Sequence, residues 1–322
     1  MIQAADLSMH YGPRVALEGA SFDVEPGQVV GLLGPNGAGK STTMKILTTY
    51  LYPTRGSAVV GGKSVRNEPL AVRRLIGYLP EVLPLYPEMR ARSYLNFVGR
   101  ARGLRGARLR QRLSWVQERC GLESAGGQLI RELSKGYQQR LGLAQALIHD
   151  PQVVILDEPT SSLDPYQILA VRELVWDLAA AGKTVLLSTH ILQEVEAIAD
   201  RLVIINQGRI VGQGTLEDLR QGLKQFERTS LSVAAPQQEI ETALNEMSDL
   251  LEVRFIHVSD GYAMFDVWAP AGRGLPRQIG TLVCDRGWRI GELHVQPPTL
   301  EETFLAVTAP PGSSEGSPVH AC

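Results

Sequence analysis

Three short, largely apolar runs stand out in the first 220 residues, and each run ends in polar residues. The runs are Val29–Leu33, Val153–Leu156 and Thr184–Ser188. Uninterrupted apolar runs of this length are typical of strands buried on both faces of a parallel sheet, and the helical patterns between them supply the crossovers. The chain therefore predicts an α/β domain over residues 1–220, with its ligand site at the C-terminal ends of the strands.

Residues 82–145 have a different pattern. They contain no strong strand signal and are mostly helical in their spacing of apolar residues. This predicts a helical subdomain, inserted between the glycine-rich loop that follows Leu33 and the strand that ends at Leu156.

The pattern changes again after the first domain and predicts a second, smaller domain over residues 221–306. Strand-like and helical segments alternate in the order βαββαβ, and they are Thr229–Val233, Pro236–Met247, Leu251–Val258, Tyr262–Trp268, Leu275–Asp285 and Trp288–Val295. This order predicts a ferredoxin-like α+β unit. Its Cys284, His257 and His294 are too dispersed for a metal site. The domain could regulate the first, hold two copies together or sense a ligand, and we expect regulation or dimer stabilisation. Residues 307–322 are rich in Pro, Gly and Ser, which predicts a disordered tail.

The run Val29–Leu33 leads into a loop, Gly34-Pro35-Asn36-Gly37-Ala38-Gly39-Lys40-Ser41, that fits the phosphate-loop pattern. An apparent helix, Thr42–Leu51, follows, so the motif has the strand–loop–helix context it requires. Glycines let backbone N–H groups turn inward onto the β- and γ-phosphates, and the helix adds its positive N-terminal end. Lys40 supplies a cation for the phosphate oxygens, and the Ser41 hydroxyl supplies a ligand for Mg²⁺. The flanking strand and helix argue against a glycine turn that matches by chance.

Two adjacent carboxylates, Asp157 and Glu158, stand at the end of the run Val153–Leu156. In phosphate-loop enzymes an acid in this place holds Mg²⁺, directly or through water, and we expect that role of Asp157. Glu158 is the candidate general base for the attacking water, a role that contributes roughly 10²–10⁴-fold to a rate. Such a pair alone is more often a solvated strand end, but the glycine loop upstream favours the catalytic interpretation.

Composition limits the class of protein and its location. The 322 residues carry a formal net charge of −2, and nothing in their overall composition points to a nucleic-acid partner. No stretch approaches the roughly 20 apolar residues of a membrane span, and residues 1–6 lack a signal-peptide pattern. Cys120, Cys284 and Cys322 have neither metal-ligand nor disulfide spacing. We therefore expect a cytoplasmic chain; if it serves a membrane, the membrane part is another chain.

Four further segments, taken in order with the phosphate loop, resemble the ABC transporter ATPases. Leu133–Arg140 resembles the signature LSGGQ, Ser161–Asp164 the D-loop, and Ser188–His190 the switch-histidine segment. Tyr11 stands where that family stacks an aromatic ring on adenine. Each segment alone is weak, because a Ser-Lys-Gly is usually a helix cap and a lone histidine or tyrosine is usually structural. The ordered set, however, covers residues 1–220.

The resemblance implies an ATPase that dimerises head to tail, so that the signature of one chain closes on the ATP held by the glycine loop of the other. Ser134 and Gly136 precede a predicted helix, Gln138–Ile148. A serine hydroxyl and helix N-terminal amides are suited to the γ-phosphate of the partner's ATP. His190 is expected to reach the γ-phosphate and to report its presence.

Taken together, the resemblance assigns the cofactors, the site and the partners. The expected catalytic residues are Glu158 and His190, and the expected Mg²⁺ ligands are Ser41, Glu81 and Asp157. The expected ATP-binding residues are Tyr11, Gly34, Asn36, Gly37, Gly39, Lys40, Ser41, Thr42, Ser134, Gly136 and Asp164. The expected partners are a second copy of the chain and an integral membrane permease of the type-2 exporter kind. The implied location is peripheral, on the inner face of the cytoplasmic membrane, where the chain energises export.

Two departures from the family pattern lie within the site motifs. Lys135 and Tyr137 replace a glycine and a glutamine of the signature, whereas the residues expected nearest phosphate are kept. Glu81 stands where most members have the Q-loop glutamine; an ionised carboxylate only accepts hydrogen bonds, whereas an amide also donates. We expect an active enzyme with altered coupling. These departures resemble a bacterial export subgroup that contains the gliding-motility and copper/nitrous-oxide-reductase maturation ATPases. Pro298–Leu305 resembles the C-terminal element of type-2 exporter ATPases.

No acidic residue lies between Glu88 and Glu118, a stretch that is rich in arginine. Its arginines are Arg90, Arg92, Arg100, Arg102, Arg105, Arg108, Arg110 and Arg112. Because this subdomain faces the membrane partner in the family, the stretch is a candidate contact for anionic lipid heads or an acidic permease segment. A solvated helix face is the commoner explanation of such a run.

Two other functions remain open at this stage. One is a soluble ABC ATPase that acts on ribosomes or DNA, but such relatives usually fuse two cassettes or carry long coiled coils, and this chain has one set of motifs. The other is an ATP-dependent dimerisation switch without hydrolysis, against which the presence of both Glu158 and His190 argues. Cargo selection is expected to lie in the permease.

Overall fold

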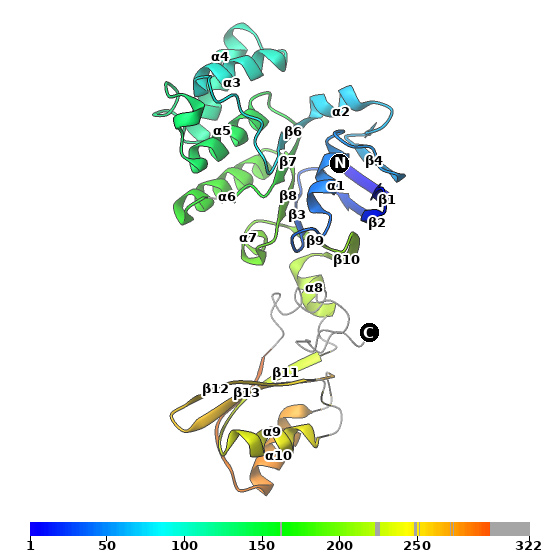
Figure 1. Cartoon of the computed structure of the whole chain (residues 1–322), viewed down its shortest axis with the longest axis vertical. Helices are drawn as coiled ribbons and strands as arrows, with labels where there is room; N and C mark the ends of the chain where they lie inside the picture. Colours follow the sequence, from blue (N-terminus) through cyan, green and yellow to red (C-terminus); the bar gives the residue numbers. More distant parts are fainter. Residues whose placement is uncertain are drawn as a thin grey trace. The chain divides into compact units, whose positions relative to one another are not determined.

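The computed structural model describes residues 1–161, 163–222, 226–247, 250, 252–270, 272 and 274–296. The chain divides into two compact units, Met1–Thr215 and a second that begins at Leu216. Figure 1 labels their elements. The expected tail 307–322, the segment Pro298–Leu305 and Ser162 of the D-loop lie outside the described residues. Among the helices that the structure describes, none is long and apolar enough to cross a membrane.

The first unit alternates strands and helices along most of its length. Its strands are β1 (Ile2–Tyr11), β2 (Arg14–Val24), β3 (Val29–Leu33), β4 (Arg55–Val60), β5 (Lys63–Ser64), β6 (Ile76–Leu79), β7 (Val153–Asp157), β8 (Thr184–Thr189), β9 (Arg201–Asn206) and β10 (Arg209–Gly214). Its helices are α1 (Lys40–Leu47), α2 (Pro69–Leu75), α3 (Ala91–Ala101), α4 (Gly106–Arg119), the 3₁₀ helix η1 (Ile130–Glu132), α5 (Lys135–Leu147), α6 (Pro165–Ala180) and α7 (Leu192–Glu196).

The three apolar runs are neighbouring strands of one six-stranded sheet, whose order is β10-β9-β3-β8-β7-β6. Strands β3, β8 and β7 pair in parallel, and every residue in them is buried. The register places Leu33 beside Thr189 and Asp157 beside Ser188, so the C-terminal ends of these strands share one edge of the sheet. The predicted α/β fold, with its polar residues gathered at that edge, is confirmed.

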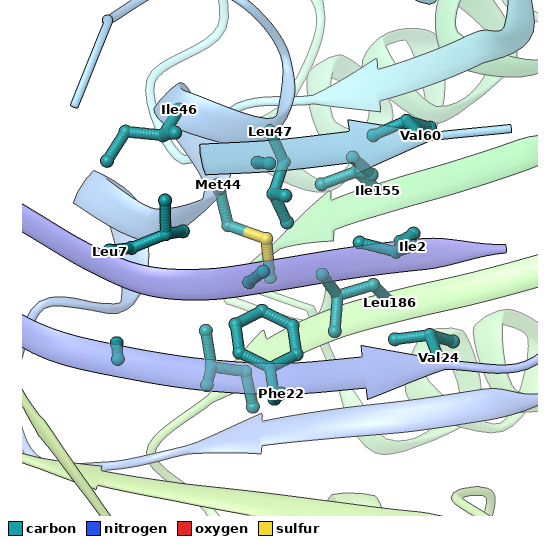
Figure 2. Close-up of a cluster of buried hydrophobic side chains, with 14 of the residues drawn as sticks. Ile2, Leu7, Phe22, Val24, Met44, Ile46, Leu47, Val60, Ile155 and Leu186 are labelled. Carbon is teal, nitrogen blue, oxygen red and sulfur yellow. The ribbon is translucent and has the colours of Figure 1, made fainter. Parts of the chain in front are cut away.

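A second sheet, antiparallel and of order β2-β1-β4-β5, was not predicted by the apolar runs. Helix α1 packs against β2 and β4 of this sheet and against β7 of the parallel sheet. Figure 2 shows Met44 of α1 directed towards Phe22 of β2, with Leu186 of the parallel sheet close by. Met44 and Leu47 are fully buried, and each such side chain contributes about 1.5–3 kcal/mol to stability. The helix that follows the glycine loop is therefore anchored in the core on two sides.

Residues 82–145 are all described, and they contain α3, α4, η1 and most of α5, with no strand. Helix α5 packs against β6 and joins α3 and α4 to the parallel sheet. In Figure 1 these three helices lie on one side of the parallel sheet, and the antiparallel sheet lies on the other. The structure therefore has a separate helical layer in the place where the sequence predicts one.

The second unit has the order of elements predicted from the sequence. After α8 (Leu216–Gly222) come β11 (Phe226–Ala234), α9 (Gln237–Asn245), β12 (Glu252–Ser259), β13 (Tyr262–Pro270), α10 (Leu275–Asp285) and β14 (Arg289–Gln296). The sheet order is β12-β13-β11-β14, with every pair antiparallel, which makes the unit ferredoxin-like. Leu231 and Phe265 of the sheet and Ile240 and Ile279 of α9 and α10 share its core. The predicted domain boundary at residue 220 falls inside α8.

Candidate active site

The glycine loop and the strand ends next to it enclose a cavity of about 420 Å³. Its lining residues are Tyr11, Arg14, Ala16, Pro35, Asn36, Gly37, Gly39, Lys40, Ser41, Thr42, Glu81 and Glu158. Most of the residues predicted to contact ATP thus lie around one space. Tyr11, at the end of β1, is 44% exposed, so its ring is available to a planar ligand. Gly34 is not in the lining, but its carbonyl oxygen holds the lysine of the loop.

The turn into α1 depends on Gly39. Its φ is +112°, which L side chains rarely adopt, and a Cβ there would lie 2.7 Å from the Ala16 carbonyl oxygen. Gly39 is also the N-cap of α1, so the helix begins at Lys40 and ends at Leu47. The predicted helix, Thr42–Leu51, is therefore wrong at both ends. Lys40, Ser41 and Thr42 form the first helical turn, whose backbone N–H groups lack helical acceptors and suit an anion.

Lys40 is almost fully buried, with its side chain 6% exposed. Its Nζ donates hydrogen bonds to the carbonyl oxygens of Gly34 at 2.7 Å and Pro35 at 3.2 Å. The same Nζ lies 3.4 Å from Oε1 of Glu158. The cation is thus held between the loop backbone and a carboxylate, and a phosphate that entered the cavity would compete for it.

Asp157 receives hydrogen bonds from two hydroxyl groups. Oγ of Ser41 donates to its Oδ1 at 3.3 Å, and Oγ of Ser188 donates to the same atom at 2.5 Å. Burial raises the pKa of Asp157; the two hydroxyls lower this pKa, and the negative charges of Glu81 and Glu158 raise it further. Burial and the neighbouring negative charges therefore destabilise the ionised form of Asp157, and a bound divalent cation would offset this destabilisation. Hydroxyl and carboxylate oxygens are ligands that Mg²⁺ takes, so the residues fit that ion.

Glu158 and His190 form a contact pair at the ends of β7 and β8. Nδ1 of His190 lies 3.0 Å and 3.2 Å from the two carboxylate oxygens of Glu158. The Glu158 side chain is 11% exposed and that of His190 is 47% exposed, so the pair reaches from the interior to the surface. The backbone of Glu158 has a φ of +50°, which is uncommon outside glycine and is typical of functional sites.

Three residues without a predicted role contribute to this geometry. Ser188 accepts the backbone N–H of Glu158 at 3.1 Å, and Gln139 donates through Nε2 to the carbonyl oxygens of Glu158 at 3.3 Å and Pro159 at 3.1 Å. These bonds hold the unusual backbone of Glu158. Arg14 lines the cavity beside Tyr11. Gln139 lies in the segment that resembles the signature, and Ser188 lies at the end of a predicted strand. The sequence therefore located both residues but did not show which groups they bind.

The signature and D-loop residues lie outside this cavity in the single chain. Ser134 is the N-cap of α5, and its Oγ accepts the backbone N–H of Tyr137 at 3.3 Å. Because that cap starts the helix at Lys135, the predicted start at Gln138 is wrong, and Gly136 lies in the first turn. Asp164 caps α6 by accepting the backbone N–H of Gln167 at 2.9 Å. None of Ser134, Gly136 and Asp164 is among the cavity's lining residues.

Comparisons with known proteins agree with this geometry. A family model described as ABC transporter matches residues 17–161. The Nod factor export ATP-binding protein I of Rhizobium etli is 34% identical over 316 residues, covering 95% of this chain and 93% of that protein. The linearmycin resistance ATP-binding protein LnrL of Bacillus subtilis is 31% identical over 308 residues, covering 96% and 98%. The dimeric structure of a bacterial ABC transporter cassette aligns with a TM-score of 0.63 at 26% identity, covering 67% of this chain and 99% of that one.

Proposed function

The chain belongs to the ABC transporter family as an ATP-binding and ATP-hydrolysing subunit that uses Mg²⁺, and we propose that it energises export through a separate membrane permease of the type-2 exporter kind. The match to export and resistance ATP-binding proteins over more than nine-tenths of both chains supports this proposal. A soluble ATPase without a permease has no comparable support among these relatives. The proposed location is the inner face of the cytoplasmic membrane.

The observation that carries the enzymatic part is the convergence of Lys40, Ser41, Asp157, Glu158 and His190 at one edge of the parallel sheet. We assign Lys40 to the phosphate oxygens and Glu158 to the attacking water as general base. Nδ1 of His190 lies 3.0 Å from the Glu158 carboxylate. This contact keeps the base oriented towards the protein surface, on the side where the γ-phosphate would lie. Ser41 and Asp157 would hold Mg²⁺, which when bound neutralises charge on the phosphates.

Nucleotide binding also changes the partners of Glu158 in this proposal. In the single chain Lys40 lies 3.4 Å from the Glu158 carboxylate. Triphosphate oxygens carry more negative charge than one carboxylate and two carbonyl groups, so Lys40 turns to them. Glu158 then loses its cation and becomes a stronger acceptor for the proton of a water molecule. Substrate binding and base activation are thereby linked through one lysine.

The cavity is only half of the proposed site. Ser134 and Gly136 present a helix N-terminus that does not line the cavity of their own chain. A second copy, arranged head to tail, would bring this helix start to the γ-phosphate held by the first copy. The alignment with a dimeric cassette supports this arrangement. Closure of the two copies on ATP, and reopening after hydrolysis, is the motion that the permease would convert into transport.

Assembly with a permease tests the proposed function. We expect the chain, captured by an affinity tag from detergent-solubilised membranes of its host, to bring down a polytopic membrane protein. We expect its ATP turnover to rise several-fold in that complex, because the permease holds two copies at high effective concentration. The measurement is phosphate release per chain, with and without the membrane protein. Recovery from the soluble fraction alone, with the same turnover in both preparations, would favour the soluble ATPase.

The arginine-rich stretch supports a narrower membrane contact than its composition predicts. Arg102 donates to the Arg73 carbonyl at 2.6 Å, and Arg112 donates to the carbonyls of Leu147 at 2.6 Å and Ile148 at 3.1 Å. Arg105 donates to the carbonyls of Arg100 and Leu104. These three arginines therefore bind the chain's own backbone and stabilise the helical layer. We assign the proposed contact with anionic lipid heads or an acidic permease segment to other exposed arginines of the stretch, Arg108 and Arg110 of α4 among them.

Reversal of both charges, Arg108→Glu with Arg110→Glu, should weaken binding to vesicles that contain phosphatidylglycerol. Each basic residue near such a surface is worth about 1 kcal/mol, so losing two attractions reduces binding at least roughly 30-fold. Co-sedimentation with the vesicles measures this loss, and Arg66→Glu with Arg209→Glu is the matched control on other exposed arginines. Equal binding by the two double variants would contradict a lipid contact at α4.

A further inference from the structure

The side-chain amide of Gln167, in the first turn of α6, fills the space that a side chain at Gly136 would need. A Cβ atom at Gly136 would lie 2.5 Å from Oε1 of Gln167 and 3.3 Å from its Cδ and Nε2. Gly136 is buried and belongs to the first turn of α5. The start of α5 and the start of α6 are therefore in contact where the Gln167 side chain lies against Gly136, which has no side chain.

The other end of the same amide is fixed by Asp164. Nε2 of Gln167 donates to Oδ2 of Asp164, and the backbone N–H of Gln167 donates to Oδ1 at 2.9 Å. The bond from Nε2 to the carboxylate of the capping aspartate accounts for the position of Nε2. It does not account for Oε1, which is buried and has no donor among the described residues. A buried acceptor without a donor is costly, so the position of Oε1 needs an explanation beyond the capping of α6.

The first turn of α5 offers the donors that Oε1 lacks. Ser134 accepts the N–H of Tyr137 through Oγ and that of Gln138 through its carbonyl oxygen. The N–H groups of Lys135 and Gly136 have no acceptor one turn earlier in the helix, as at every helix start. Within the part of the chain that the structure describes, no backbone bond satisfies them. Gln167 thus places an acceptor without a donor against a helix turn whose N–H groups lack acceptors.

We propose that Gln167 is a positioning residue that ties the signature turn at Gly136 to the D-loop end at Asp164, so that the two helix starts move as one element when a second copy's ATP is bound. The inference rests on the proposed head-to-tail site, since Ser134 and Gly136 have no phosphate of their own to hold. Gln167 does not line the cavity that binds the chain's own nucleotide. Its loss therefore affects closure of the dimer and turnover, and leaves binding of nucleotide to a single chain unchanged.

The first experiment uses the full-length chain with Glu158→Gln, which stops turnover so that closure can be measured as an equilibrium. ATP-dependent dimerisation is followed by analytical ultracentrifugation, with and without Gln167→Ala. We expect the dimer to dissociate about 10-fold more readily with Gln167→Ala, as for the loss of one hydrogen-bonded contact. Binding of a fluorescent ADP analogue to the dilute single chain should change less than about twofold. Gln111→Ala, an exposed glutamine of α4, is the matched control.

A double-mutant cycle tests whether Gly136 and Gln167 act through each other. Gly136→Ala forces the new Cβ into the place of the amide, so dimerisation should weaken. Adding Gln167→Ala removes the amide, and the double variant should be no weaker than Gly136→Ala alone. Independent roles would instead multiply the two losses. A residue that only caps α6 would lower the thermal unfolding midpoint and leave the dimerisation constant of the folded protein as it is.

The outcomes separate this inference from the function on which it rests. If Glu158→Gln alone forms no ATP-dependent dimer, the shared site itself is wrong. If Glu158→Gln dimerises and Gln167→Ala in that background stays within twofold of the Gln111→Ala control, the shared site stands and the role of Gln167 is wrong. If the losses in the cycle multiply, the coupling of Gly136 to Gln167 is wrong.

Discussion

Replacement of Glu158 with glutamine is expected to lower ATP turnover by roughly 10²–10⁴-fold, the usual contribution of a general base. The amide has nearly the same shape as the carboxylate, so the backbone bonds to Ser188 and Gln139 remain. It takes no proton from water, and the reaction therefore loses its base. The contact with His190 at 3.0 Å changes from a charge-assisted bond to a neutral one.

The same substitution should leave ATP binding intact or strengthen it. Lys40 still has the carbonyl oxygens of Gly34 and Pro35, at 2.7 Å and 3.2 Å, so it stays in place. Removing the carboxylate 3.4 Å away removes a competitor of the phosphates for the same cation. The expected product is a dimer that persists for as long as ATP and Mg²⁺ are present.

Two measurements decide this prediction. Phosphate release gives the turnover, and light scattering after gel filtration, with ATP and Mg²⁺ in the buffer, gives the oligomeric state. Glu173→Gln, an exposed glutamate of α6, makes the same chemical change away from the cavity and should behave as wild type. Turnover by Glu158→Gln above a tenth of the wild-type rate would show that another group accepts the proton.

The strands that carry this chemistry could be predicted because their burial leaves a plain trace in the sequence. In β3, β7 and β8 every residue is buried, so each contains a largely apolar run that is followed by polar residues. The antiparallel strand β1 alternates buried and exposed positions only at its start, over residues 2–5, and is interrupted by register shifts. Such a strand resembles loop sequence when no partner is known, and for this reason the second sheet was missed.

Helix starts were less predictable than strands, for a local reason. Glycines at positions 37, 39 and 136 lower helix propensity, so the sequence favours starts after them. In the structure α1 begins at Lys40, directly after Gly39, and α5 begins at Lys135, where the side-chain cap of Ser134 outweighs the low helix propensity of Gly136. The shift matters for function, since it places Lys40, Ser41 and Gly136 in first turns, where free N–H groups are available to phosphate.

The contacts that join motifs could not be predicted from any one motif. Ser188 reaches Asp157 because β7 and β8 are neighbours, and Gln167 reaches Gly136 because α5 and α6 begin close together. Each depends on the pairing of segments distant in sequence, which local pattern does not specify.

The departure at Glu81 is different: the residue lines the cavity as expected, and its charge is among the causes that raise the pKa of Asp157. An uncharged glutamine in its place would not add that negative charge beside the proposed Mg²⁺ ligands.

Replacement of Gly39 with alanine is expected to weaken ATP binding by about two orders of magnitude. The new Cβ would lie 2.7 Å from the Ala16 carbonyl oxygen and 2.8 Å from Cδ2 of Leu17, and the first of these atoms belongs to the backbone of β2. A backbone atom of a strand yields less than the end of a flexible side chain does, so the loop must move instead. Its φ of +112° adds strain of about 1–3 kcal/mol for an alanine.

The size of the effect follows from what the loop presents. Moving Gly39 displaces the first turn of α1 and with it the inward N–H groups of Lys40 and Ser41. A hydrogen bond to a charged group contributes about 1.5–3 kcal/mol, so losing two such bonds reduces affinity by roughly 100-fold or more. Titration with a fluorescent ATP analogue measures the loss, and circular dichroism establishes that the variant is folded.

The variant Gly37→Ala distinguishes the effect of the close contact with β2 from the effect of backbone strain at a positive φ. Gly37 also has a positive φ, +80°, but a Cβ there would meet nothing within 4 Å. It belongs to the same loop and lines the same cavity, but it has no close approach to β2. We expect its affinity loss to stay below about tenfold, because strain at the tip of the loop is relieved without moving α1. Equal losses in the two variants would mean that backbone strain, and not the packing of Gly39 against Ala16, holds the loop in the shape that binds phosphate.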